Sequence, residues 1–196
     1  MLAYVFWHWR RDDADAATYE AAQRAFHDAL AAEPSAGFVG SFSHALRGAR
    51  WANAGGEAYE DWYLVNGSAA LDPLNIAAVT AGRQAPHDVA AAQAAGGTAG
   101  LYRLRLGELG RGPSVAHWFE KPAGMPYPQF LARMEGAVDG ASGALFIRQM
   151  VLGPTTECVL LAPLATSLPP GIEALALHLR PVVGWHPASR SAPAGI

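Results

Sequence analysis

The amino-acid sequence predicts an α+β fold made of two similar units, each running strand, helix, strand, strand, helix, strand. Two observations lead to this prediction. Short segments rich in β-branched and aromatic residues alternate with segments of helical periodicity. The same series begins again after a break that contains glycine and proline, at residues 110–113. The composition agrees, because 196 residues with 51% hydrophobic and 16% charged side chains are too apolar for a disordered protein.

The first unit is expected at residues 1–110. Its elements are, in order, a strand at 3–10, a helix over 19–30 capped by Asp15 or Thr18, strands at 38–46 and 59–65, helical pieces at 71–81 and 87–95, and a strand at 101–106. The strands are rich in residues that suit a pleated, packed surface, and the helix has apolar positions at helical spacing. This order of elements is the ferredoxin-like one.

The second unit is expected at residues 111–186. Its elements are a strand at 115–121, a helix over 126–138, a hairpin of 143–152 and 157–162 joined by Gly153-Pro154, a weak helical segment at 163–174 interrupted by proline, and a strand at 177–184. Residues 187–196 are rich in proline, alanine and serine and are predicted to be a flexible tail. Tyr19 and Phe26 in the first helix match Tyr127 and Met134 in the second, as a duplication would produce.

Composition also excludes several classes of function. The net charge is −3 and no basic stripe is present, so a nucleic-acid partner is not expected. No apolar stretch approaches the roughly 20 residues of a membrane helix. Residues 1–10 have neither a basic start nor a long apolar run, so they are not expected to be a leader. We therefore expect no membrane partner and a cytoplasmic location. A single cysteine and seven dispersed histidines without a short ligand motif predict no metal site and no cofactor.

Part of the first unit resembles a known superfamily. The segment Asp-Trp-Tyr-Leu-Val at 61–65, the later His87, and Gly-Leu-Tyr-Arg-Leu at 100–104 look like the second half of a dimeric α/β-barrel module. The whole chain is similar to a tandem form of that superfamily. The resemblance implies two ferredoxin-like repeats packed sheet to sheet as a barrel within one chain, with helices outside and a cavity between the sheets. Haem-binding members exist, but the Gly-x-x-Asp-Gly signature of one haem family is absent here.

Strand alternation selects candidate site residues for such a cavity. His8 and His117 are the catalytic candidates, because imidazole exchanges protons near neutral pH. Arg103 and Arg148 are candidates for holding a carboxylate or enolate oxygen, and Trp62 for walling a flat apolar ligand. The alternative is structural: the arginines pair with Glu60, Asp61 or Glu157, the histidines satisfy backbone groups, and the tryptophans are core. His27 is expected to face solvent, and His44 and His186 to lie in loops or the tail.

These features predict a protein that binds a small molecule, as a monomer or a homodimer. As an enzyme it would resemble a cofactor-independent monooxygenase or isomerase acting on an aromatic or enolic compound. A non-catalytic ligand-binding or stress-related module is the alternative, and a haem-binding enzyme is the third hypothesis. Fold alone does not choose among these.

Overall fold

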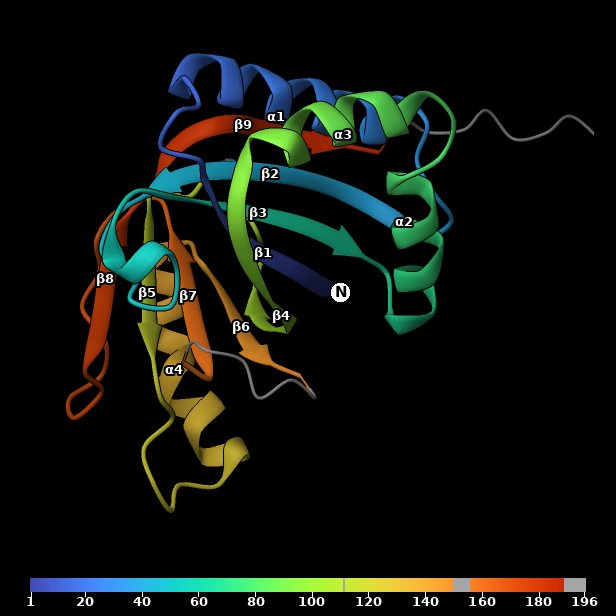
Figure 1. Ribbon diagram of the computed structural model, residues 1–196. Helices are drawn as coiled ribbons and strands as arrows, with labels where there is room; N and C mark the ends of the chain where they lie inside the picture. The colour runs from blue at the N-terminus through green and yellow to red at the C-terminus, as the bar shows by residue number, and fades with distance from the viewer. Residues whose placement is uncertain (111, 150–155, 189–196) are drawn as a thin grey trace, which may run out of the picture.

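The computed structural model describes residues 1–110, 112–149 and 156–188 (Figure 1). Within these ranges, nine strands form one sheet in the order β8-β5-β7-β6-β4-β1-β3-β2-β9, together with four α-helices. All pairings between neighbouring strands are antiparallel. The predicted α+β class agrees with this arrangement. None of the helices in these ranges has the length and apolar character that crossing a bilayer requires. The predicted Gly153-Pro154 turn and residues 189–196 of the predicted tail lie outside the described residues.

The first half contains the predicted elements. They are β1 (Leu2–Arg10), α1 (Ala16–Ala32), β2 (Phe38–Leu46), η1 (Asn53–Gly55), β3 (Ala58–Val65), η2 (Ser68–Ala70), α2 (Leu71–Ala78), η3 (Ala81–Arg83), α3 (Gln84–Gln93) and β4 (Ala94–Gly107). Asp15 is the N-cap of α1, because its side chain accepts a hydrogen bond from the Thr18 amide at 2.8 Å. The four main strands are ordered β4-β1-β3-β2.

Strand β4 begins well before the predicted start at residue 101, in a stretch that contains Gly96, Gly97 and Gly100. Glycine is a poor strand former, so this stretch gave no strand signal. The reason for strand formation lies in β1, with which β4 pairs. A Cβ atom at Gly97 would lie 2.4 Å from Cζ of Phe6, and one at Gly96 would lie 2.6 Å from Cζ2 of Trp9. Glycine therefore makes room for the aromatic side chains of the neighbouring strand.

We expect Gly97→Ala to destabilise the protein by about 1–3 kcal/mol, because the new methyl group overlaps the ring of Phe6 and lies 3.0 Å from the carbonyl oxygen of Trp7. Gly136→Ala in α4 is the matched control. It has no atom within 4 Å of the new Cβ, so the higher helix propensity of alanine should raise stability by about 0.5–1 kcal/mol. Urea unfolding of both variants measures the effect, and equal stabilisation by the two substitutions would contradict this explanation of the glycines.

The second half differs from the prediction at two points. Its elements are β5 (Val115–Phe119), α4 (Tyr127–Ala141), β6 (Ala144–Arg148), β7 (Cys158–Ala162), β8 (Ala174–His178) and β9 (Arg180–Pro187), with main strands ordered β8-β5-β7-β6. No helix forms at 163–173, where three prolines lack amide donors. The single strand predicted at 177–184 is two strands separated by Leu179. What separates the two strands is their pairing, since β8 pairs with β5 and β9 pairs with β2. The alternation of side chains along the sequence carries no information on strand pairing.

The sheet curls until its two ends meet. Strands β8 and β9 are at opposite ends of the strand order, yet Leu179 alone joins them. Side chains from the two halves pack in the interior: the rings of Trp7 and Trp118 are 5.4 Å apart, and those of Trp62 and Phe146 are 5.1 Å apart. One apolar cluster occupies this space. The prediction of a cavity between the sheets is therefore wrong. The helices lie outside, with α1 and α3 over the first half and α4 against the second (Figure 1).

Candidate functional site

A cavity of about 460 Å³ lies on the opposite, helix-facing side of the first half. Side chains from β1, β3, the start of β4 and the three helices α1, α2 and α3 line it. The aromatic ones are Tyr4, Phe6, Tyr19, Phe26, Tyr63 and His87, the aliphatic ones include Leu30, Leu71, Leu74 and Ala78, and the polar ones are His8, Gln23, Asp61, Asp72 and Asn75. Apolar walls with a few polar groups are typical of a small-molecule site.

Two periodicities bring polar side chains together at the base of the cavity. On α1, Tyr19, Gln23 and His27 follow one another at intervals of four residues, so they share the face that is buried against the sheet. In the strands, alternation puts His8 of β1 and Asp61 of β3 on the same side of the sheet. In the register of β1 and β3, Asp61 lies opposite Phe6, which is two residues from His8 and on the same face. Helix α1 and the sheet thus place polar side chains next to one another at the base of the cavity.

Asp61 is the centre of this group. Its Oδ2 atom lies 3.1 Å from Nε2 of His8 and 3.5 Å from Nε2 of His27, and it accepts a hydrogen bond from the Tyr63 hydroxyl at 2.9 Å. Both histidine contacts are within ion-pair distance. Burial by itself would raise the pKa of Asp61, but the charges and hydrogen bonds of His8 and His27 outweigh it and hold that pKa well below its usual range. Asp61 is therefore ionised.

The contacts continue from both imidazoles. Nδ1 of His8 is 2.6 Å from the Tyr19 hydroxyl, and Nδ1 of His27 is 2.7 Å from Oγ of Ser41 on β2. Together Tyr19, His8, Asp61, His27 and Ser41 form an unbroken series, which we call the Asp61 chain. Burial, and then the charge of Asp61, raises the pKa of Tyr19. Tyr19 therefore keeps its proton, and its hydroxyl lies within hydrogen-bond distance of Nδ1 of His8.

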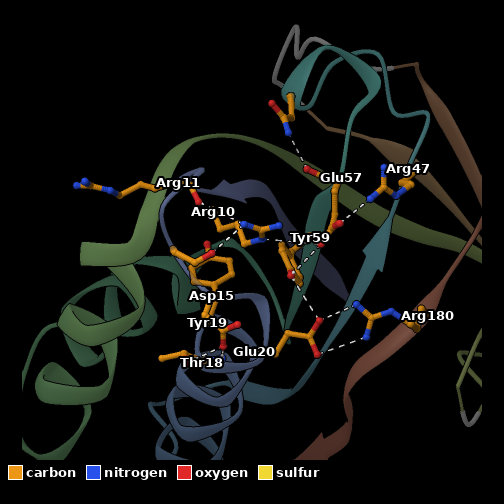
Figure 2. A network of polar contacts seen from close by, with 12 residues as sticks. Arg10, Arg11, Asp15, Thr18, Tyr19, Glu20, Arg47, Glu57, Tyr59 and Arg180 are labelled. Carbon is orange, nitrogen blue, oxygen red and sulfur yellow. Dashed lines mark hydrogen bonds and ion pairs between the residues drawn. The ribbon is translucent and has the colours of Figure 1, made fainter.

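Stacked rings fix the plane of His8. Its imidazole lies between Phe6, at 5.3 Å, and Tyr59, at 5.5 Å with an interplanar angle of 10°. The Tyr59 hydroxyl lies 3.4 Å from Glu20 and 3.3 Å from Glu57 (Figure 2). Burial, followed by the negative charges of these two carboxylates, raises the pKa of Tyr59 to about 12. Tyr59 thus stays uncharged behind His8.

The carboxylates that hold Tyr59 are themselves paired with arginines. Glu20 accepts a hydrogen bond from Nη2 of Arg180 at 2.6 Å, and Glu57 lies 2.7 Å from Nη2 of Arg47 (Figure 2). Arg180 belongs to β9, so the Glu20 contact joins the last strand to α1. These pairs are partly exposed and each is worth little on its own. Their role here is to orient the tyrosine that stacks on His8.

The arrangement can move a proton. A carbon acid above Tyr19 could release its proton to the phenol oxygen while the phenol proton passes to Nδ1 of His8. The resulting imidazolium would lie beside the ionised Asp61, which stabilises it. Among the described residues, no group of three histidine, cysteine, aspartate or glutamate side chains is placed to hold a metal ion.

The five predicted site residues do not lie together in one site. His8 is in the cavity, but on the helix-facing side and not between the sheets. Nε of Arg103, on the outer face of β4, donates to Oε1 of Gln149 at 3.1 Å. His117 is on the outer face of β5 in the other half, where its Nε2 accepts from the Thr166 amide at 3.3 Å and burial lowers its pKa. These positions contradict the predicted gathering of the site residues around one inter-sheet cavity.

The other two predicted residues face the interior. Trp62 is fully buried in the apolar cluster between the two groups of strands. Arg148 lies opposite Tyr102 in the register of β6 and β4, on the same inward side of the sheet. The alternative pairing of Glu60 with an arginine is also not observed: Glu60 accepts hydrogen bonds from the indoles of Trp7 and Trp62, both at 2.6 Å. The interior therefore separates these residues from the cavity.

Several residues of the Asp61 chain were not predicted. His27 was expected to face solvent, but its side chain is 0% exposed. The signal was present, because His27 lies four residues after Gln23 and eight after Tyr19, on the buried stripe of α1. His44 and His186 were expected in loops or the tail, but they lie in β2 and β9. Burial lowers the pKa of His44 to about 4, against the attraction of Asp61.

No protein-family model matches the chain, and no curated protein matches it. A solved crystal structure, described as that of an anthrone oxidase-like protein, has a TM-score of 0.50 against this chain at 11% sequence identity. The match covers 100% of this chain and 96% of the other. At this level of identity the likeness concerns the fold, which the two proteins share over their whole length.

Proposed function

We propose that this protein is a cofactor-independent oxidase that binds a flat aromatic carbon acid, such as an anthrone, in the helix-facing cavity. The observation that carries the proposal is the Asp61 chain, which ends in Tyr19 at the base of an apolar, aromatic cavity. Such a cavity suits a flat apolar ligand, and the phenol–imidazole–carboxylate series suits removal of a proton from it. The anthrone oxidase-like neighbour supports this class of substrate through its shared fold.

The proposed reaction balances with molecular oxygen as the oxidant. The methylene carbon of the anthrone loses a proton to the Tyr19 oxygen while the Tyr19 proton passes to His8, and the electron pair of the broken C–H bond delocalises to form an enolate. Oxygen then bonds to that carbon, and the proton returns from His8 through Tyr19 to the peroxide oxygen. Loss of water from the hydroperoxide leaves the anthraquinone. One oxygen molecule is reduced for each anthrone oxidised, with one water released.

We further infer that residues 1–110 and 111–186 are two ferredoxin-like units of the dimeric α/β-barrel superfamily on one chain. The inference is supported by the strand order, which is β4-β1-β3-β2 in the first half and β8-β5-β7-β6 in the second. The proposed site belongs to the first unit. In the second unit, Phe130, Met134 and Val138 of α4 pack directly on β5, β6 and β7.

Oxygen uptake with 1,8-dihydroxyanthrone tests the proposed function. We expect one oxygen consumed per anthraquinone formed, at a rate above the buffer blank. Tyr19→Phe should lower kcat by about 10²–10⁴-fold, since it removes the proton-transferring hydroxyl. Tyr127→Phe, on the exposed start of α4, is the matched control and should retain wild-type activity.

The contrary result is also informative. No uptake above the blank, together with a thermal shift produced by 1,8-dihydroxyanthraquinone, would reject the oxidase proposal and favour the non-catalytic ligand-binding module. Neither uptake nor a thermal shift would reject both the reaction and the ligand class.

A further inference from the structure

The cavity has a buried base and a rim of different composition. The base holds Tyr19, His8 and Asp61, on which the proposed reaction depends. The rim is formed by α2 and α3, to which that reaction assigns no part. The cavity-lining residues of α2 have the spacing of one helical face, at positions 71, 72, 74, 75 and 78. The rim therefore contacts the part of a ligand that lies away from Tyr19.

Most of the rim is small and apolar. Alanine occupies the cavity-lining positions 78, 90, 91 and 94, and such short side chains leave the volume between the helices open. The polar side chains of the rim are Asp72, Asn75 and His87. Asp72 and Asn75 are exposed and three residues apart on α2, so they are neighbours at the entrance. A polar group of a ligand at the entrance would meet these two side chains.

No lysine or arginine in the described part of the chain lines this cavity. Arg103 and Arg148, the residues predicted to hold a carboxylate, both lie elsewhere. The guanidinium of Arg83, between α2 and α3, is already engaged: Nη1 lies 3.3 Å from a carboxylate oxygen of Glu33, and Nε donates to the Ala77 carbonyl at 2.8 Å. A carboxylate bound in the cavity would therefore lack the cation that an anion removed from water requires.

The histidines that line the cavity do not supply that cation either. Nε2 of His8 lies 3.1 Å from Oδ2 of Asp61. Nδ1 of His87 lies 3.0 Å from Oδ1 of Asp88. Each imidazole is thus beside a carboxylate of the protein, which would balance the charge of the ring if the ring were protonated.

Asp72 differs from the other carboxylates near the cavity. It is exposed, and among the described residues its side chain makes no ion pair and accepts no hydrogen bond. An exposed aspartate carries a negative charge at neutral pH. A ligand carboxylate at the rim would be repelled by that charge. A ligand hydroxyl would instead find an acceptor in Asp72, and both a donor and an acceptor in Asn75.

We propose that the cavity takes an uncharged polycyclic phenol, and that Asp72 is the residue that discriminates against a substrate with a carboxylate at the rim. This inference rests on the proposed function, whose substrate class it narrows. When the methylene carbon of an anthrone lies against Tyr19, its carbonyl oxygen, both hydroxyl groups and any substituent at C2 lie on the opposite edge of the molecule. That edge is the part that meets Asp72 and Asn75.

Three 1,8-dihydroxyanthraquinones that differ only at C2, where they carry a methyl, a hydroxymethyl or a carboxylate group, test the inference. Their dissociation constants at pH 7 are measured by quenching of tryptophan fluorescence. The hydroxymethyl compound should bind about 10–100-fold more tightly than the carboxylate, because of repulsion and of desolvation without a cation. The ratio should fall at high salt, which screens an exposed charge. Equal or tighter binding of the carboxylate would overturn the inference.

Asp72→Asn separates repulsion from other causes of discrimination. It should lower the ratio of the two dissociation constants by about 3–10-fold, through tighter binding of the carboxylate compound. Asp72 also lies in the first turn of α2, where a negative charge favours the helix. Weakening of that helix would affect all three ligands alike and would leave the ratio unchanged, which would overturn the role of Asp72. Asp139→Asn, on the exposed side of α4, removes the same charge far from the cavity and is the control.

Oxygen uptake keeps this inference distinct from the proposed function. Discrimination against the carboxylate in a protein that oxidises no anthrone would support the inference and reject the oxidase. Oxidation of 1,8-dihydroxyanthrone by a protein that prefers the carboxylate compound would do the opposite. Binding of none of the three quinones would reject the ligand class, and the inference with it.

Discussion

Asp61→Asn should reduce turnover of 1,8-dihydroxyanthrone by about 10³-fold or more, while the protein still binds 1,8-dihydroxyanthraquinone. The carboxylate contacts Nε2 of His8 at 3.1 Å, and in the proposed reaction it stabilises the imidazolium that forms when Tyr19 gives up its proton. An asparagine has no charge to do this, and its amide can favour the other tautomer of His8, with hydrogen on Nδ1. That tautomer cannot accept the Tyr19 proton. Loss of the carboxylate from an analogous aspartate–histidine pair costs about 10⁴-fold.

The same substitution should also lower stability, in a pH-dependent way. Removing one partner of a buried ionic group costs about 3 kcal/mol or more at pH 7. The pKa of Asp61 is depressed in the folded state from its ordinary value of 3.8. The contribution of Asp61 to the free energy of unfolding is therefore fully present above about pH 4. It is lost as the pH falls toward the pKa of Asp61 in the folded state. The stability difference between wild type and variant should shrink in that acid range.

Urea unfolding at pH 7 and pH 3, with oxygen uptake at pH 7, measures both effects. Asp28→Asn is the matched control, because Asp28 lies on the surface of α1 and pairs with His186 at 3.2 Å. It should change neither activity nor stability by much. Wild-type turnover in Asp61→Asn would remove the Asp61 chain from the mechanism.

Strand alternation accounts for which side chains share a face of the sheet. It puts Tyr4, Phe6 and His8 on one face of β1, and all three line the cavity. It also puts Asp61 and Glu60 on opposite faces of β3: Asp61 lines the cavity, and Glu60 contacts the interior tryptophans. What alternation could not decide was which face the helices cover, because both faces of β1 are rich in aromatic residues. The catalytic candidate His8 was therefore assigned to the wrong space.

The position of the cavity depends on packing that a local pattern does not contain. Trp7 and Trp118 are distant in sequence, and their contact fills the interior that the prediction left open. The cavity exists on the other side because α1, α2 and α3 surround a volume over β1 and β3 that their side chains do not fill. By contrast, His27 was predictable from helical spacing on α1. Its partner Asp61 was predicted from the sequence only as a possible ion-pair partner of an arginine.

Glu60 should give the largest pH-dependent effect on stability. It lies in the interior with 0% exposure, and each carboxylate oxygen accepts an indole N–H, from Trp7 and from Trp62. Burial raises its pKa to about 7 from an ordinary value of 4.5, although the two indole hydrogen bonds oppose the rise. His44, directly opposite in the β2–β3 register, has a pKa of about 4 and offers no positive charge near neutral pH.

The sign of the effect follows from the raised pKa. Glu60 binds its proton more tightly in the folded state, so its contribution to stability is full below about pH 4.5 and is lost as the pH rises through about 7. The difference between the two pKa values corresponds to about 3 kcal/mol. Glu60→Gln lacks this titration. At pH 5 the variant should be less stable by about 1–3 kcal/mol, because the glutamine amide faces an indole N–H and two donors oppose each other.

The stability gap between wild type and Glu60→Gln should therefore change by about 2.5 kcal/mol between pH 5 and pH 8 in favour of the variant, as the wild-type carboxyl ionises inside the apolar cluster. Urea unfolding followed by tryptophan fluorescence measures the gap at each pH. Asp61 is present in both proteins, so its own titration cancels in the difference. Glu33→Gln, at the exposed end of α1, should show no pH-dependent gap. A constant gap for Glu60→Gln would mean that the two indoles keep Glu60 ionised throughout, and that hydrogen bonding outweighs burial at this carboxylate.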